Sequence, residues 1–187
     1  MIISDLHRRH PVELDHPALC FNGREISFAQ LEYQVEQYAR YFIRRGLGPG
    51  ERVAIALPNC PEFIYAYLGI ARAGGVVVPL NLLQAPQELF FIVLDSGAKM
   101  LLTNSSISQH VRKFPNLPSE MLVLDEVLLE EIMAAPAAEY PETGEDEVCT
   151  FLYTSGTTGK PKAAMLTHAN LLGDVLCMDR ASGLSGG

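Results

Sequence analysis

The chain has 187 residues, of which 48% are hydrophobic and 19% are charged, and its formal net charge is −8. This length and composition suit one full globular domain or most of one, and the acidic balance argues against general nucleic-acid binding, which needs a basic face. No run approaches the ~18 consecutive apolar residues of a membrane span, and the first ten residues lack the layout of a secretory signal. The four cysteines form no CxxC pair, so neither a metal site nor a disulfide framework is predicted, and the expected location is the cytoplasm.

The N-terminal quarter of the chain is expected to begin with a hairpin and continue as a helix. Two short strands are predicted within residues 18–26, because Asn22-Gly23 between them is typical of a two-residue turn. Ser27 is a predicted helix N-cap, and Gln30 completes a capping box three residues later. Apolar residues then follow at helical spacing until Gly46, which suits the end of a helix.

The middle of the chain alternates strands and helices. Continuous apolar runs indicate strands that are buried on both faces of a parallel sheet. Strands are predicted at residues 53–57, 76–80, 100–103 and 121–124, helices at 61–74 and 86–96, and a helix or a loop at 105–114. This alternation predicts an α/β fold with a mostly parallel sheet flanked by helices.

An acidic segment divides this part from the C-terminal one. Residues 139–147 contain five acids and lie close to two prolines. An acidic run could ligate a metal, but a solvated surface linker is the favoured interpretation. We therefore expect an α/β subdomain at 1–137, a linker at 138–147, and a unit at 148–187 that holds a strand, a loop and a helix.

The loop is the most informative stretch of the sequence. Tyr153-Thr-Ser-Gly-Thr-Thr-Gly-Lys-Pro-Lys162 follows a strand predicted at 148–152 and precedes a helix predicted at 167–178, for which Thr167 is a candidate N-cap. Small residues let backbone N–H groups approach an anion, hydroxyls donate hydrogen bonds, and lysines supply positive charge. The glycine spacing is not that of a Walker A loop. Composition alone leaves two alternatives, a phosphate-binding loop and a solvated surface loop.

Residues 151–168 resemble the signature of the adenylate-forming, AMP-binding enzymes, which include acyl-CoA synthetases, luciferases and peptide-synthetase adenylation domains. Segments 22–28, 50–59 and 69–79 resemble the beginning of the same family. Ala163 is a departure, because the family usually has glycine there. The resemblance implies that residues 1–187 form an incomplete N-terminal domain of the adenylate-forming fold.

The resemblance also implies ATP, Mg²⁺ and coenzyme A as partners of the reaction, and it implies which residues bind ATP. The loop would wrap the β- and γ-phosphates of ATP, with Lys162 as the catalytic lysine that provides positive charge. Lys160 stands at a more variable position and could equally be a surface lysine. His168 is interpreted as a structural residue that orders the loop or the start of the helix through a hydrogen bond, and no metal ligand is predicted. The implied nucleotide-binding residues are Thr154, Ser155, Gly156, Thr157, Thr158, Gly159, Lys160 and Lys162.

The function implied by the resemblance is that of an ATP-dependent acyl-CoA synthetase. Such an enzyme activates a carboxylic acid, here expected to be a fatty acid, as an acyl-adenylate and transfers it to coenzyme A. Three family elements find no match in the chain: the aromatic-Gly-x-Thr-Glu motif, the ribose-binding aspartate and the C-terminal-domain lysine. These 187 residues alone are therefore expected to be inactive. A truncated, non-catalytic paralogue that binds phosphate or a partner protein is the alternative, and an exposed sheet edge predicts a homodimer.

Overall fold

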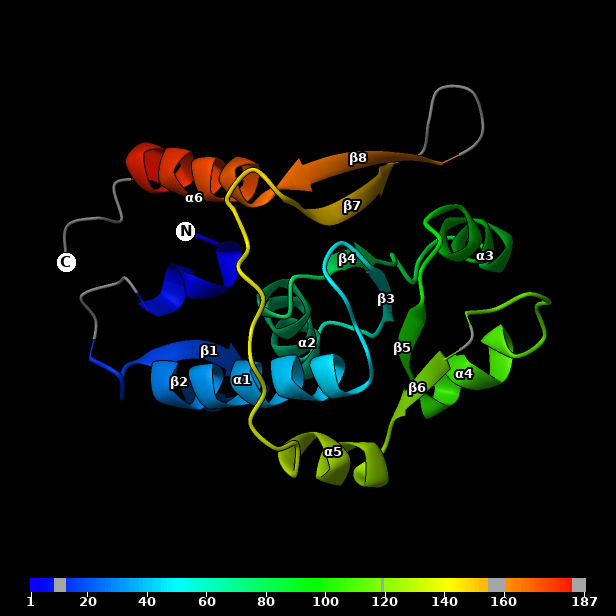
Figure 1. Ribbon diagram of the computed structural model, residues 1–187, viewed down its shortest axis with the longest axis horizontal. Helices are drawn as coiled ribbons and strands as arrows, with labels where there is room; N and C mark the ends of the chain where they lie inside the picture. Colours follow the sequence, from blue (N-terminus) through cyan, green and yellow to red (C-terminus); the bar gives the residue numbers. More distant parts are fainter. Residues whose placement is uncertain (9–12, 119, 155–160, 183–187) are drawn as a thin grey trace.

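A computed structural model describes residues 1–8, 13–118, 120–154 and 161–182 of the chain (Figure 1). Most elements follow the predicted alternation of strands and helices. In chain order they are η1, a 3-10 helix (Ile3–Arg8), β1 (Pro17–Phe21), β2 (Arg24–Ser27), α1 (Phe28–Arg44), β3 (Arg52–Ala56), α2 (Pro61–Arg72), β4 (Val76–Pro79), α3 (Pro86–Asp95), β5 (Met100–Asn104), α4 (Ser105–Val111), β6 (Glu120–Leu124), α5 (Glu126–Met133), β7 (Val148–Thr154), β8 (Lys162–Thr167) and α6 (His168–Ser182).

The main sheet has six strands in the order β6-β5-β3-β4-β7-β8. Its first five strands are parallel to their neighbours, and β8 runs antiparallel to β7. Because β3 lies between β4 and β5, the chain builds the sheet outward from β3 in both directions. The predicted α/β fold with a mostly parallel, helix-flanked sheet is confirmed.

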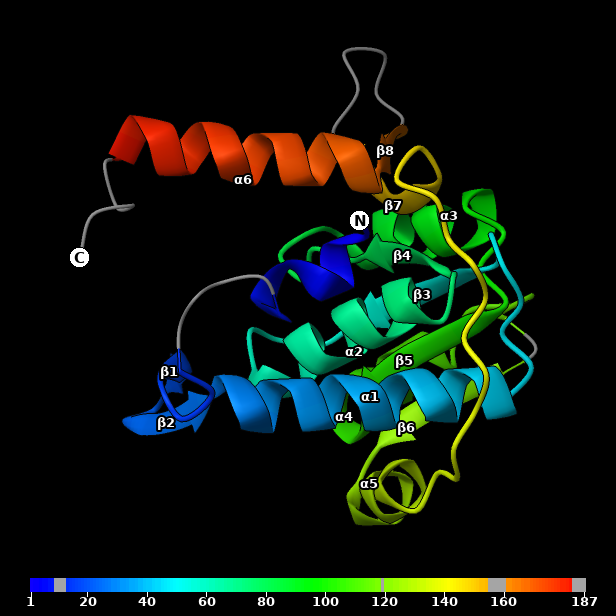
Figure 2. The same cartoon turned by 60° about the vertical axis from the view of Figure 1, so that its left-hand side comes forward.

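Helices cover both faces of this sheet (Figure 2). Val53 and Ile55 of β3 pack in one core with residues of α1, α2 and α5. Ala54 and Ala56 of the same strand pack in a second core with residues of α3 and α4. Successive side chains of a strand point to opposite faces, so a strand between two helical layers must be apolar throughout, which is the pattern that predicted it.

The local signals at the N-terminal end are confirmed in their details. Asn22 and Gly23 both have positive φ, 51° and 76°, as a type I′ turn between β1 and β2 requires. The Ser27 hydroxyl accepts from the Gln30 N–H, and the Gln30 side chain accepts from the Ser27 N–H. Helix α1 then packs closely on α2, where a Cβ at Gly69 would stand 2.7 Å from the Cβ of Tyr38.

The C-terminal part differs from the prediction in one respect. The loop does not lie between a strand and a helix, because β8 follows it and pairs with β7 before α6 begins. The predicted helix and its N-cap are confirmed: the Thr167 hydroxyl accepts from the Asn170 N–H at 3.2 Å. The segment between Thr154 and Lys162 therefore connects two antiparallel strands, and β8, which was not predicted, separates it from α6.

Two further elements were not predicted, namely η1 and α5. Between α5 and β7, residues 135–144 contain no helix or strand, and this extended segment connects opposite ends of the molecule (Figure 1). Among the described residues, no helix combines the length and the apolar character that crossing a bilayer demands.

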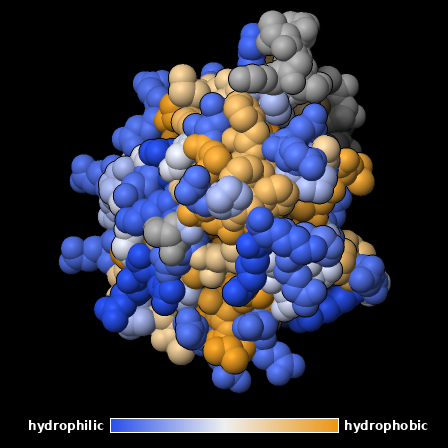
Figure 3. Space-filling model, turned by 90° about the vertical axis from the view of Figure 1, so that its right-hand side faces the viewer, coloured by the Kyte–Doolittle hydropathy of each residue, from blue (hydrophilic) through white to orange (hydrophobic). Residues whose placement is uncertain are grey.

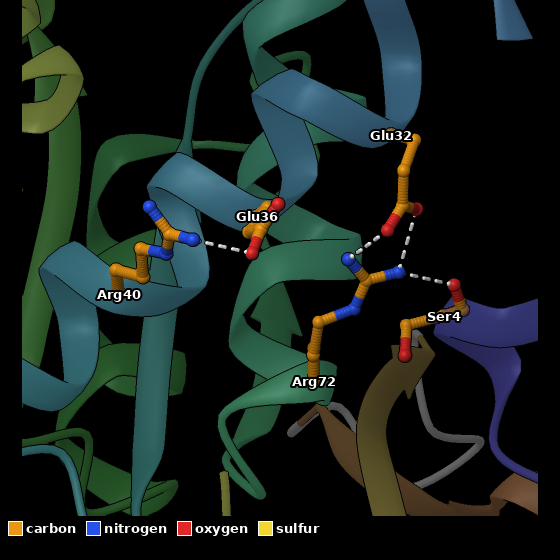
Figure 4. Close-up of polar contacts among 5 residues, drawn as sticks. All are labelled: Ser4, Glu32, Glu36, Arg40 and Arg72. Carbon is orange, nitrogen blue, oxygen red and sulfur yellow. Dashed lines mark hydrogen bonds and ion pairs between the residues drawn. The ribbon is translucent and has the colours of Figure 1, made fainter. Parts of the chain in front are cut away.

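A buried ion pair attaches η1 to the helical layer (Figure 4). Arg72, at the end of α2, is 4% exposed. Its guanidinium donates to both carboxylate oxygens of Glu32 on α1, at 2.9 and 3.0 Å, and to the Ser4 carbonyl at 2.9 Å. This bidentate geometry is the strong form of an arginine–carboxylate pair, and it fixes three elements relative to one another.

Candidate phosphate-binding site

The hairpin of β7 and β8 carries the predicted phosphate-binding residues. Thr154, the last residue of β7, pairs in the antiparallel ladder with Lys162, the first residue of β8. Both residues are exposed, so the Thr154 hydroxyl and the Lys162 ammonium are available to an anion. The remaining predicted residues lie outside the described part of the chain; they are Ser155, Gly156, Thr157, Thr158, Gly159 and Lys160.

A groove of about 600 Å³ lies next to this hairpin. Its walls come from the segments that follow β3 and β4 and from the end of β7. The lining residues are Leu57, Pro58, Asn59, Phe63, Pro79, Leu80, Asn81, Leu82, Leu83, Gln84, Leu152 and Tyr153. In open α/β sheets, ligands bind outside the carboxyl ends of the parallel strands. The groove occupies that position. Thr154 follows the lining residue Tyr153 in β7, and Lys162 pairs with Thr154.

The groove is partly apolar and partly polar. Leu83 is 95% exposed and Leu152 is 44% exposed, while the amide side chains of Asn59, Asn81 and Gln84 belong to the same lining. Viewed from the side of α3 and α4, hydrophobic side chains form a band between hydrophilic ones (Figure 3). A ligand with an apolar portion and a polar portion matches this distribution of side chains.

Tyr153 connects the hairpin to α3. Its hydroxyl donates to the Asp95 carboxylate at 2.7 Å. Burial raises the pKa of Tyr153, and the hydrogen bond and negative charge of Asp95 raise it further, so the phenol stays protonated at neutral pH. Sequence reasoning missed Asp95, because a single acid at the end of a predicted helix carries no sign of a partner 58 residues away.

The opposite end of the hairpin is anchored in the interior. The hydroxyls of Tyr67 and Thr150 share a hydrogen bond, and Cys149 is fully buried. His168 is 1% exposed, and its Nδ1 accepts the backbone N–H of Ile3 at 3.1 Å. Burial lowers the pKa of His168, which keeps the imidazole neutral. This geometry agrees with a structural role, although the partner is η1 rather than the loop.

The described residues offer few candidates for direct metal binding. Across 1–8, 13–118, 120–154 and 161–182, no group of three or more His, Cys, Asp and Glu side chains is placed to hold an ion. The donor set at the hairpin is instead a hydroxyl and an ammonium, from Thr154 and Lys162. These groups suit phosphate oxygens, which accept hydrogen bonds and carry negative charge.

Comparison with known proteins identifies the family of the chain. The model of the AMP-binding enzyme family matches residues 6–184. The crotonobetaine/carnitine–CoA ligase of Salmonella heidelberg (strain SL476) is 30% identical over 177 residues, covering 84% of this chain and 34% of the ligase. Surfactin synthase subunit 3 of Bacillus subtilis (strain 168) is 30% identical over 165 residues, covering 88% of this chain and 13% of that protein.

A solved structure supports the same relationship. The Mycobacterium tuberculosis fatty acyl CoA synthetase superposes with a TM-score of 0.68 at 30% identity, covering 78% of this chain and 30% of the synthetase. The chain thus spans about a third or less of these relatives. A family match over nearly all of its length, together with the hairpin and the strand-end groove, establishes that the chain belongs to the AMP-binding enzyme family.

Proposed function

We propose that this chain is the phosphate-binding portion of an acid–thiol ligase, an AMP-forming acyl-CoA synthetase. In this reaction a substrate carboxylate attacks the α-phosphorus of ATP, pyrophosphate leaves, and the acyl group passes from the adenylate to coenzyme A. The observation that carries the proposal is the pairing of Thr154 with Lys162 at the edge of the strand-end groove. That pairing places a hydroxyl and an ammonium at the two ends of the signature loop.

The chemistry requires positive charge at this position. A carboxylate is a weak nucleophile and a triphosphate is densely anionic, so the site must reduce repulsion and stabilise the leaving pyrophosphate. Lys162 supplies one positive charge, and Mg²⁺ bound to the phosphate oxygens would supply more. The loop residues Ser155 to Lys160 would contribute hydroxyls and backbone N–H groups to the β- and γ-phosphates.

The substrate class is a further step of the proposal. A carboxylic acid with an apolar chain, such as a fatty acid, suits a groove that combines Leu83 and Leu152 with amide side chains. The proposed setting is the cytoplasm, where ATP and coenzyme A are available. We also propose that these 187 residues alone do not complete the reaction, because the motifs that would hold ribose and Mg²⁺ are absent from the sequence.

The phosphate assignment can be tested on the chain itself with sodium tripolyphosphate as the probe. Calorimetric titration is expected to detect binding to the wild-type chain, and Lys162→Ala is expected to weaken it about tenfold, as loss of one charge-assisted hydrogen bond implies. Lys113→Ala, at an exposed lysine outside the site, is the matched control. Equal affinities for wild type and Lys162→Ala would refute the assignment.

The proposed inactivity has a separate test. Hexadecanoate-dependent exchange of labelled pyrophosphate into ATP is expected to stay at background with this chain. Tripolyphosphate binding without exchange would agree with a part of a ligase, whereas exchange well above background would show that 187 residues are sufficient for adenylation.

A further inference from the structure

A second cavity lies away from the strand-end groove and shares no lining residue with it. Its volume is about 420 Å³, within the ~300–1,000 Å³ range of small-molecule sites. The hairpin of β1 and β2, the helices α1 and α5, and the first turns of α2 enclose it. The lining residues are Phe21, Arg24, Ile26, Gln34, Tyr38, Pro61, Glu62, Tyr65, Leu129 and Met133.

Tyr38 forms part of the wall of this cavity. The residue is fully buried, and its hydroxyl finds no hydrogen-bond partner among the described residues. Burial raises the pKa of Tyr38, and the negative charge of Glu62 adds to the shift, so the hydroxyl remains protonated. A buried hydroxyl without a partner is destabilising, and native proteins rarely keep one without a bound water or ligand.

Two opposite charges line the same cavity. Arg24 comes from the start of β2, and Glu62 from the first turn of α2. They form no ion pair with each other in the described part of the chain. Both nevertheless act on Tyr65, whose pKa is raised chiefly by burial, raised further by Glu62 and lowered by Arg24. The hydroxyl of Tyr65 therefore lies within the field of both charges.

The remaining walls are apolar and aromatic. The rings of Tyr38 and Tyr65 lie 6.0 Å apart between centroids, and Phe21, Leu129 and Met133 complete this surface. Aromatic faces and a carboxylate together favour an ammonium group. A guanidinium favours a carboxylate, which it can bind in a bidentate manner. We propose that this cavity binds a small zwitterion that carries an ammonium and a carboxylate on an apolar body, as an apolar amino acid does.

Each group of the cavity has a part in this recognition. The carboxylate of the ligand pairs with Arg24, its ammonium lies near Glu62 and the tyrosine rings, and its apolar portion contacts Phe21, Leu129 and Met133. The Tyr38 hydroxyl, which has no hydrogen-bond partner among the described residues, donates to the ligand. The site is independent of the proposed ligase function, because it shares no residue with the phosphate-binding hairpin or its groove.

Three probes of similar size test the proposal by calorimetry on the chain: L-phenylalanine, 3-phenylpropanoate and phenethylamine. The second lacks the ammonium and the third lacks the carboxylate. L-Phenylalanine is expected to bind about tenfold more tightly than either of the other two, since each loses one charge-assisted contact. Absence of phenylalanine binding at 10 mM, or equal affinity for all three probes, would overturn the proposal.

Single substitutions assign the charges. Arg24→Gln is expected to reduce the affinity for phenylalanine to that for phenethylamine, and Glu62→Gln to that for 3-phenylpropanoate. Arg112→Gln and Glu88→Gln, at exposed positions outside the cavity, are matched controls that should leave binding unchanged. Phenylalanine binding that survives both cavity substitutions would contradict the site. Tripolyphosphate binding should be the same in all four variants, which separates this result from the proposed function.

Tyr38→Phe provides a measurement that does not depend on charge. It removes a hydroxyl without a partner and keeps the ring, so the melting temperature of the free chain is expected to rise. The affinity for phenylalanine is expected to fall severalfold at the same time. A higher melting temperature with unchanged affinity would show that the hydroxyl does not contact the ligand, and it would contradict this part of the proposal.

Discussion

Two cations of this chain, Arg72 and Lys162, illustrate how differently the fold uses positive charge. Arg72 is 4% exposed and donates to a carboxylate and a carbonyl from two other elements. Lys162 is exposed at the start of β8, beside the strand-end groove. Removing a charge from water is costly unless it is paired, so a buried arginine is tied to its partners. An exposed lysine can exchange water for an incoming anion. Burial and pairing therefore distinguish a structural cation from a candidate ligand-binding cation more clearly than residue type does.

Arg72→Ala tests the structural role of the buried arginine and should have the largest effect on the free energy of unfolding. It leaves the Glu32 carboxylate and the Ser4 carbonyl without their shared donor, which should lower the free energy of unfolding by about 3–5 kcal/mol. Urea denaturation measures the loss. Arg40→Ala, which removes the more exposed i,i+4 pair with Glu36 on α1 (Figure 4), is the comparison variant and should cost about 1 kcal/mol or less. Similar losses for the two variants would contradict the role assigned to Arg72.

The second prediction concerns pH and the attachment of η1 behind the hairpin. Burial lowers the pKa of His168 below its unfolded value of about 6.5. The unfolded chain then binds a proton more readily than the folded chain below that pH. The neutral imidazole of His168 therefore makes its full contribution to the free energy of unfolding above about pH 6.5. This contribution is lost as the pH falls, by at most about 1.4 kcal/mol per pH unit.

Urea midpoints from pH 7.5 to 5.0 test this dependence. His168→Asn retains a side-chain acceptor for the Ile3 N–H but does not titrate in this range. The difference in stability between wild type and this variant should shift in favour of the variant as the pH falls. A difference that is constant across the range would show that His168 does not titrate on unfolding.

The sequence predicts local features of this fold well because their causes lie within a few residues. The Ser27–Gln30 capping box and the Asn22-Gly23 turn are examples, since each requires only neighbouring backbone. β8 is different: Lys162-Ala-Ala-Met-Leu-Thr has little intrinsic preference for a strand, and pairing with β7 determines its conformation. The Tyr153–Asp95 and Arg72–Glu32 contacts join residues 58 and 40 positions apart, so no local pattern announces them.

The candidate site was predictable only in part: the sequence indicated the loop but not the groove beside it. The residue types of Tyr153 to Lys162 left a phosphate-binding loop and a solvated loop as alternatives, and the resemblance of residues 151–168 to the family signature favoured phosphate. The family match covers this segment, and the role of its individual residues stays a prediction. The position of the loop between two strands, and the groove built from Asn59, Asn81 and Tyr153, required the three-dimensional arrangement of strand ends. Single side chains on two separate connections and one strand end form no sequence motif.

Tyr153→Phe tests whether the hydrogen bond to Asp95 positions the hairpin at the candidate site. Loss of the hydrogen bond to Asp95 should lower the free energy of unfolding by about 1 kcal/mol. Because this contact fixes the residue before Thr154, tripolyphosphate binding should also weaken. Asp95→Asn preserves an acceptor and should have a smaller effect on both measurements. Unchanged binding in Tyr153→Phe would limit this contact to stability.

The smallest effect on stability is expected at the outer edge of the hairpin. β8 is an edge strand of the six-stranded sheet, and Met165 on it is 65% exposed. An apolar edge strand favours pairing with another strand, so the chain is expected to form dimers.

Met165→Lys adds a charge on this edge. It should change the free energy of unfolding by less than about 0.5 kcal/mol and shift the chain toward the monomer. Light scattering at several concentrations measures the mass, and Val127→Lys, at an exposed apolar residue of α5, controls for added charge. A wild-type chain that stays monomeric at every concentration would show that this exposed edge does not drive self-association.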